Sequence, residues 1–127
     1  MIFVAGVVAG SLTIPAMSAQ VRTVKNIRLL TADLGGWCDG KEVVVDLNES
    51  SGPGTSGRHY HPAHSFSFMI VGEQTTTVEG MPPKTTRAGE IEHEDPMQMH
   101  TSVNTGPVKS LTFRIIVKGK PTTVRVQ

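Results

Sequence analysis

Two histidines separated by one residue form the part of this sequence best suited to chemistry. His59 and His61 flank Tyr60. On an extended strand, residues two apart point to the same face with their Cα atoms about 6.6 Å apart, so both imidazoles can reach one ion. Such a pair is a weak signal on its own, because histidines on strands also cap loops.

A third imidazole is available from a second stretch of the chain. His100 lies on a predicted strand over 97–103, where Gln98, His100, Ser102 and Asn104 share one face. This stretch is distant in sequence from His59, so only the fold can bring the two together. The candidate metal ligands are His59, His61 and His100.

The elements that must position these histidines are short strands. Apolar residues alternate with polar ones, and no long window shows the spacing of an amphipathic helix, which indicates an all-β chain. Val43, Val45 and Leu47 share a face opposite Asp46, so we expect that apolar face to be the buried one. The clearest strands are 42–47, 66–70 and 111–117, and weaker ones are 21–30, 74–78, 84–87, 97–103 and 122–126. Glycine and proline clusters separate these strands, a pattern typical of a sandwich or a small barrel.

Composition excludes several classes of protein. The 127 residues carry 12 Lys and Arg against 11 Asp and Glu, with only 4 Phe, 1 Trp and 1 Tyr. This near-neutral balance lacks the basic patch of a nucleic-acid-binding protein. The single cysteine, Cys38, excludes an intramolecular disulfide and zinc sites built on paired cysteines. Any metal must therefore be held by histidine or carboxylate.

Trp37, beside Cys38 in a glycine-rich turn, is expected to be buried at the end of the barrel.

The first 21 residues contain no charged side chain. An apolar run over 2–9 is followed by Pro15 and by small residues ending at Ala19, as in a secretory signal peptide. We expect a signal peptide over 1–19 and a single domain over 20–127, which implies an exported protein, periplasmic or secreted. An uncleaved membrane anchor and a first strand of a cytoplasmic protein are the alternatives.

Two motifs in this sequence resemble those of the cupins, small jelly-roll β-barrels. The first reads from Gly54 through His59 and His61 to Gly72. The second reads from Gly89 through Pro96 to His100 and Asn104, with one residue fewer than usual between the proline and the histidine. The resemblance covers about 43–118, and local phrases are similar to single-domain cupins described as quercetin-dioxygenase-like. It implies an all-β, single jelly-roll barrel.

The resemblance also implies a metal site, with one departure. Ser65 stands where these proteins usually carry a glutamate ligand, which leaves His59, His61 and His100 and open positions for water and substrate. The implied cofactor is a divalent transition metal: Fe, Mn, Ni, Cu or Zn. Other residues that could add a ligand or support the histidines are His64, Ser65, Gln98 and Asn104. Glu92 and Glu94 could also accept an imidazole N–H, although we expect the segment 92–95 to be a solvated acidic loop.

Three functions follow from this resemblance. The first is a metal-dependent dioxygenase acting on a small enolic or phenolic substrate, and the second is a redox-neutral isomerase, lyase or decarboxylase. The third is a non-catalytic module that binds a small molecule or a metal; the sequence assigns no catalytic residue. The expected partners are a small molecule and a second copy of the chain, paired through edge strands at 21–30 or 122–126, with a membrane involved only if the N-terminal segment is uncleaved.

Overall fold

The computed structural model describes residues 25–127, so the predicted signal peptide at 1–19 lies outside the described residues. This part of the chain is built from strands, as predicted, with one three-residue 3-10 turn, η1. No helix among the described residues is long and apolar enough to cross a membrane. The strands are β1 (Lys25–Asp33), β2 (Lys41–Ser50), β3 (Gly54–Thr55), β4 (His59–Tyr60), β5 (Ser65–Val71), β6 (Glu73–Val78), β7 (Lys84–Arg87), β8 (Ile91–Glu94), β9 (His100–Asn104), β10 (Val108–Val117) and β11 (Val124–Arg125).

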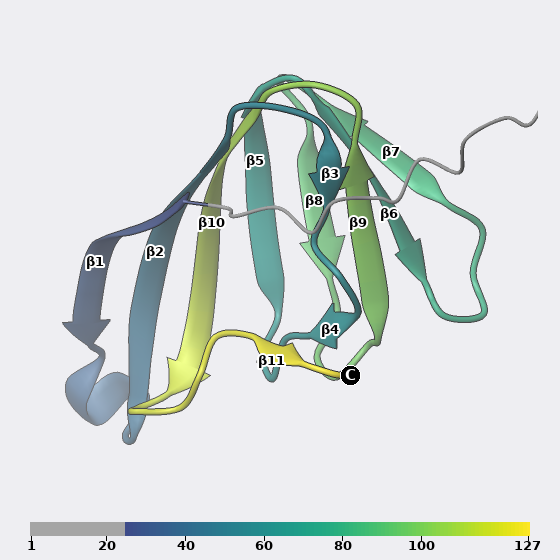
Figure 1. Ribbon diagram of the computed structural model, residues 1–127. Coiled ribbons are helices and arrows are strands. Elements are labelled where there is room, and N and C mark those ends of the chain that lie inside the picture. The colour runs from purple at the N-terminus through teal and green to yellow at the C-terminus, as the bar shows by residue number, and fades with distance from the viewer. Residues whose placement is uncertain (1–24) are drawn as a thin grey trace, which may run out of the picture.

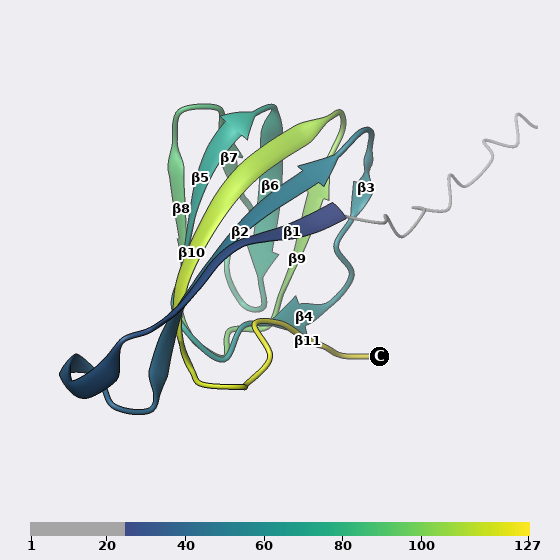
Figure 2. The same ribbon diagram turned by 90° about the vertical axis from the view of Figure 1, so that its left-hand side faces the viewer.

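The strands form two antiparallel sheets that face each other. One sheet has the order β1-β2-β10-β5-β8, and the other has the order β11-β4-β9-β6-β7 with β3 paired to β9. Figure 1 shows β1, β2, β10 and β5 of the first sheet on the left and β9, β6 and β7 of the second sheet on the right, and Figure 2 shows the first sheet in front of the second. Chain segments alternate between the sheets, so β4 and β9, which carry the candidate histidines, become neighbours despite their separation in sequence.

The alternation along the long strands is as predicted, but the inward face is the opposite one. Val44 and Asp46 of β2 are fully buried, whereas Val43 and Val45 are only partly covered. On β10, Arg114 is buried while Phe113 is 40% exposed. Period-two alternation identifies two faces without saying which one is inside. Here the space between the sheets is polar, and the apolar face of the five-stranded sheet points outward.

β8 is a strand that the sequence pattern did not predict. Glu92 and Glu94 alternate with exposed residues and are buried, so the expected solvated acidic loop is wrong. Ser65 of β5 lies directly opposite Glu94 of β8 in the register of the two strands. The sheet thus directs two carboxylates from β8 into the space between the sheets, beside the polar residues of β5 and β10.

The turn between β5 and β6 explains the closing glycine of the first motif. Gly72 has φ +79°, and a Cβ built there would lie 2.1 Å from the carbonyl oxygen of Pro107. A side chain is therefore excluded by both conformation and space.

The prediction for the turn before β2 is wrong. Trp37, in η1 (Gly35–Trp37), is 97% exposed rather than buried.

Candidate metal centre

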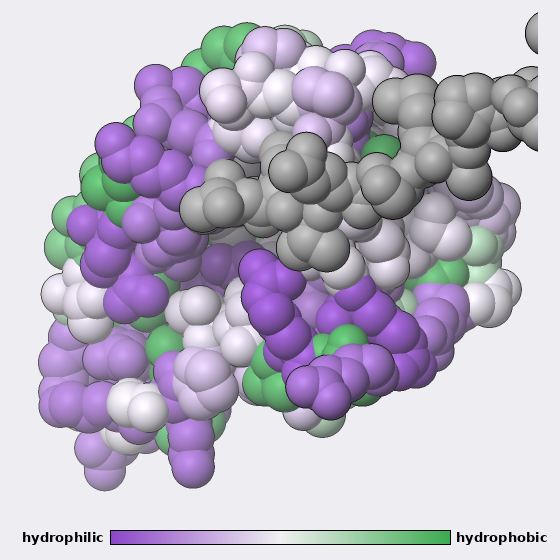
Figure 3. Space-filling model, viewed as in Figure 1, coloured by the Kyte–Doolittle hydropathy of each residue, from purple (hydrophilic) through white to green (hydrophobic). Residues whose placement is uncertain are grey.

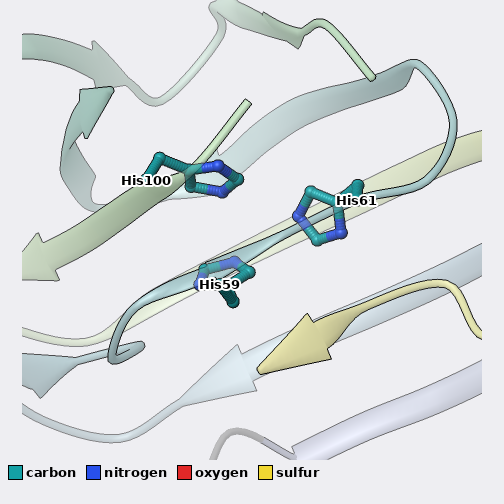
Figure 4. A group of neighbouring side chains, drawn as sticks. All are labelled: His59, His61 and His100. Carbon is teal, nitrogen blue, oxygen red and sulfur yellow. The ribbon is translucent and has the colours of Figure 1, made fainter. Parts of the chain in front are cut away.

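Three buried histidines meet at one end of the space between the sheets (Figure 4). His59 lies on β4, His61 follows it, and His100 begins β9. His59 and His100 are direct partners in the β4–β9 ladder. The spacing of two residues brings His61 to the same side as His59, with ring centroids 5.0 Å apart. The sheet therefore joins the two sequence motifs at these side chains.

Each of the three rings is oriented by a backbone carbonyl. The Nδ1 atoms of His59 and His100 lie 2.9 Å from the carbonyl oxygens of Gly57 and Gln98, respectively. The Nδ1 atom of His61 lies 2.8 Å from the carbonyl oxygen of Thr122, which precedes β11. A carbonyl can only accept a hydrogen bond, so each Nδ1 donates. The Nε2 lone pairs are left available, as in imidazoles that bind metal ions.

The nitrogen atoms are close enough to share one ion. One ligand atom from each of His59, His61 and His100 lies within 4.8 Å of the other two. The Nε2 atom of His100 is buried and makes no aligned hydrogen bond within the described residues. Three clustered imidazoles, each with its Nδ1 atom held by a carbonyl, are a donor set suited to a divalent transition metal. This cluster could therefore hold a metal ion.

Burial keeps two of the histidines in the form that binds metal. Burial, followed by the positive charge of Arg114, lowers the pKa of His61 to about 4. Burial also lowers the pKa of His59, against the hydrogen bond to Gly57. Both imidazoles are consequently neutral at neutral pH, and the neutral ring is the ligand form.

Glu94 is the neighbour that sequence reasoning valued too little. Its Oε1 atom lies 3.0 Å from Nε2 of His100, and its Oε2 atom lies 3.4 Å from Nε2 of His61. Burial disfavours charge on His100, but the adjacent carboxylate outweighs burial and raises the pKa of His100. In turn, burial acts to raise the pKa of Glu94, but the nearby histidines and Arg114 lower it. The alternation of Glu92 and Glu94 with Ile91 and His93 was the available sequence signal for a half-buried strand.

His59 and His61 border a polar cavity of about 380 Å³. His59, His61 and Glu94 line one part of it, and Arg114 lines another. Arg114 is buried, its Nε donates to Oγ of Ser65 at 2.7 Å, and its Nη1 lies 3.4 Å from Oδ2 of the buried Asp46. Hydroxyl and amide side chains complete much of the wall: Asn48, Ser56, Ser67, Gln74, Ser102, Ser110, Thr112, Thr122 and Thr123.

The other candidate residues have separate places. Ser65 faces the interior and accepts the hydrogen bond from Arg114. Gln98 contributes its backbone carbonyl to His100. Asn104 is buried at the opposite end of β9, where its Nδ2 donates to the carbonyl oxygens of Gly52 and Gly106.

His64 does not join the buried histidines. Its Nδ1 lies 3.0 Å from Nε2 of His93, and both histidines are near Oδ1 of Asp95, at 3.5 and 3.6 Å. This group is exposed, and the ring of His93 stacks on Phe66 of the outward face with an interplanar angle of 5°. The predicted alternative of His64 as a ligand of the central site therefore has no support from its position.

Comparisons with known proteins agree with this architecture. No protein-family model matches the sequence, and no curated protein matches it. Among solved structures, it is similar to a cupin superfamily protein from Desulfitobacterium hafniense, with a TM-score of 0.61 and 14% identity over 79% of this chain and 84% of that one. A Cupin 2 conserved barrel domain protein from Salinispora arenicola gives a TM-score of 0.55 and 14% identity, covering 84% and 88%.

A third similar structure is an enzyme. The DMSP lyase DddQ from Ruegeria pomeroyi gives a TM-score of 0.66 and 17% identity over 81% of this chain, which spans about half of the lyase, 51%. At these identities the likeness concerns the fold. The chain therefore has the jelly-roll fold of the small cupins, as its two histidine motifs indicated.

Proposed function

We propose that this protein is a metal-dependent cupin enzyme of the dioxygenase type, acting on a small enolic or phenolic substrate. The observation that carries the proposal is the set of three buried imidazoles, each held at Nδ1 by a backbone carbonyl. Two of them, His59 and His61, line a polar cavity. His59, His61 and His100 would hold the ion. A bound redox-active divalent ion supplies a Lewis acid for the substrate oxygen and a route for electrons to O2.

The cavity supports a small and polar substrate. Its volume of about 380 Å³ is at the low end for small-molecule sites, and its wall is rich in hydroxyl and amide groups. Arg114 and Arg125 both line it. A guanidinium group pairs well with a carboxylate or an enolate oxygen. Because Arg114 is already paired with Asp46, we infer that Arg125 is the cation available to an acidic group of the substrate while His59 and His61 face its reacting oxygen.

Oxygen uptake tests this proposal. The protein is reconstituted separately with Fe²⁺, Mn²⁺, Ni²⁺ and Cu²⁺ and supplied with a panel of small enolic and phenolic acids. Metal-dependent O2 consumption that is lost in His59→Ala and retained in His64→Ala is the expected result. His64→Ala is a suitable control because that imidazole lies in the exposed group. Absence of O2 uptake with every metal would reject the dioxygenase.

A redox-neutral reaction, by an isomerase, lyase or decarboxylase, is the second candidate, and one feature favours it. Glu94 is a buried carboxylate that lines the cavity beside the histidines, where it could take a proton from carbon next to a polarised carbonyl. One similar structure is a DMSP lyase. Turnover that continues without oxygen would select this reaction. Ligand-induced thermal stabilisation with no turnover under either condition would instead select a binding module.

A further inference from the structure

We propose that Glu94 is a carboxylate ligand of the metal centre, supplied from β8 in place of the glutamate that Ser65 replaces on β5. This inference rests on the proposed metal-dependent function and extends it to the donor set. The site would then have three imidazoles and one carboxylate, a composition that the two motifs do not predict, because the carboxylate comes from a different strand.

The first support is the register of the sheet. Ser65 and Glu94 are direct partners across the antiparallel β5–β8 ladder, so their side chains emerge side by side on the inner face. Both residues are buried, with exposed fractions of 0% and 8%. A carboxylate that starts from β8 can therefore enter much the same space as one that starts from β5.

The second support is the position of the carboxylate oxygens. Oε1 lies 3.0 Å from Nε2 of His100, and Oε2 lies 3.4 Å from Nε2 of His61. Two ligand atoms bound to one ion at about 2.0–2.2 Å, as zinc binds nitrogen and oxygen, are separated by about 3 Å in octahedral geometry and about 3.4 Å in tetrahedral geometry. Each oxygen of Glu94 approaches one nitrogen at such a separation. The group whose ligand atoms all lie within 4.8 Å of one another is His59, His61 and His100, so a bound ion would draw Glu94 further toward these histidines. Neighbouring Glu92 lines the same cavity but makes no such approach to a histidine.

The third support is what occupies the place of the missing glutamate. Nε of Arg114 donates to Oγ of Ser65 at 2.7 Å, and the same guanidinium lies beside Asp46. A carboxylate at position 65 would lie directly beside Glu94, and two like charges in that buried space repel each other. Serine at this position leaves Arg114 a neutral partner and leaves Glu94 as the carboxylate nearest the histidines.

The test measures metal binding in Glu94→Gln and in the matched control Glu92→Gln. Both changes remove one buried carboxylate from β8 and conserve shape. Zn²⁺ affinity is measured by competition with a chromophoric chelator, and the ligand set is followed through the visible absorption of bound Co²⁺. Glu94→Gln should weaken Zn²⁺ binding at least tenfold, about the loss that even an outer partner of a ligand causes, and should change the Co²⁺ spectrum. Glu92→Gln should leave both unchanged.

Moving the carboxylate back to β5 separates ligation from support. In the double variant Ser65→Glu with Glu94→Gln, we expect Zn²⁺ affinity and the Co²⁺ spectrum to return toward those of the original protein. A carboxylate that only positioned His100 would not be replaced in this way. If Glu94→Gln does not fold, as judged by circular dichroism, Glu94→Asp provides the same test, because its shorter reach should also weaken binding and shift the spectrum.

The outcomes distinguish this inference from the proposed function. If the unaltered chain binds neither Zn²⁺ nor Co²⁺, the metal-dependent function itself is wrong. If the chain binds both ions through His59 while Glu94→Gln shows the same affinity and spectrum, the function stands and the ligand role of Glu94 is rejected. Weaker binding with an unchanged spectrum and no restoration by Ser65→Glu also rejects ligation, because it reduces Glu94 to a positioning residue.

Discussion

At the scale of single residues, the buried cluster combines three oriented imidazole rings with ligand atoms that lie within 4.8 Å of one another. The anchors for His59, His61 and His100 are carbonyls of Gly57, Thr122 and Gln98, which come from three separate loops. An unfolded chain cannot present the three rings together. A metal bound at this site should therefore stabilise the folded state over the unfolded state.

Addition of Zn²⁺ should raise the melting temperature. At a free concentration one hundred times the dissociation constant, the gain is about 2.7 kcal/mol, which corresponds to about 10–20 °C for a domain of roughly one hundred residues. The measurement is a thermal melt with and without metal, and EDTA should reverse the shift. His100→Ala should lose most of the shift and His64→Ala should keep it. An equal shift in both variants would place the bound ion elsewhere.

The residue identities could be predicted from sequence to different extents. The spacing of His59 and His61 indicated one shared site, and the second motif added His100. Their shared site is consistent with the buried cluster. Glu94 was undervalued because its nearest neighbours in sequence are polar, and only the pairing of β8 with β5 shows that it is buried. The backbone carbonyls that orient the rings have no sequence signature at all.

At the scale of strands, the polar interior depends on one buried ion pair. Asp46 of β2 is fully buried between Arg114 of β10 and the half-exposed Arg28 of β1. Asp46→Ala would leave Arg114 without its partner on β2, and loss of one member of a buried pair costs about 3–5 kcal/mol. Denaturant unfolding measures this change. Asp33→Ala, which breaks an exposed pair with Lys118, is the control and should change stability little. Equal effects would show that burial of Asp46 does not matter.

The β5–β6 turn gives a second prediction for stability. Gly72 and Gly80 both have positive φ, but only at Gly72 would a Cβ meet backbone, the carbonyl of Pro107. Gly80→Ala should cost about 1–2 kcal/mol from the left-handed conformation alone. Gly72→Ala should cost about 1–3 kcal/mol more, because the neighbouring strand must shift. Equal midpoints of denaturation for the two variants would contradict the close approach.

The strands themselves were largely predictable, but their orientation was not. The predicted strands at 42–47, 66–70, 84–87 and 111–117 all lie on observed strands. The inward face of β2 and β10 was assigned wrongly because we assumed that the apolar face is the buried one. In this protein the space between the sheets is filled mostly by polar side chains, and large apolar side chains of the five-stranded sheet are exposed on its outer face.

At the scale of the whole molecule, the outer face of the five-stranded sheet is an exposed apolar surface. Phe66, Phe68, Ile70, Ile91, Phe113, Ile115 and Val117 are each between 40% and 64% exposed, on three adjacent strands. In Figure 3, which has the same view as Figure 1, hydrophilic residues cover much of the visible surface and hydrophobic residues form separate patches. Large contiguous apolar patches are rare on monomers. We propose that two copies of the chain pair through this sheet face; the pairing through edge strands that is expected from sequence stays a prediction.

Multi-angle light scattering after gel filtration tests the pairing. The unaltered chain should be a dimer, and Phe113→Lys should be a monomer because a charge at the centre of the face would be buried without a partner. Val103→Lys is the matched control, because Val103 is equally exposed, at 45%, on the other sheet. A monomeric unaltered chain, or a Phe113→Lys variant that stays dimeric, would reject this interface.

The central claim is that His59, His61 and His100 bind one divalent transition metal. Elemental analysis by mass spectrometry on the protein purified without chelator, beside its His59→Ala variant, tests it most directly. We predict near-stoichiometric Fe, Mn, Ni, Cu or Zn in the unaltered protein and a large loss of that metal in the variant. Absence of metal after reconstitution, or equal metal content in the two proteins, would contradict the claim.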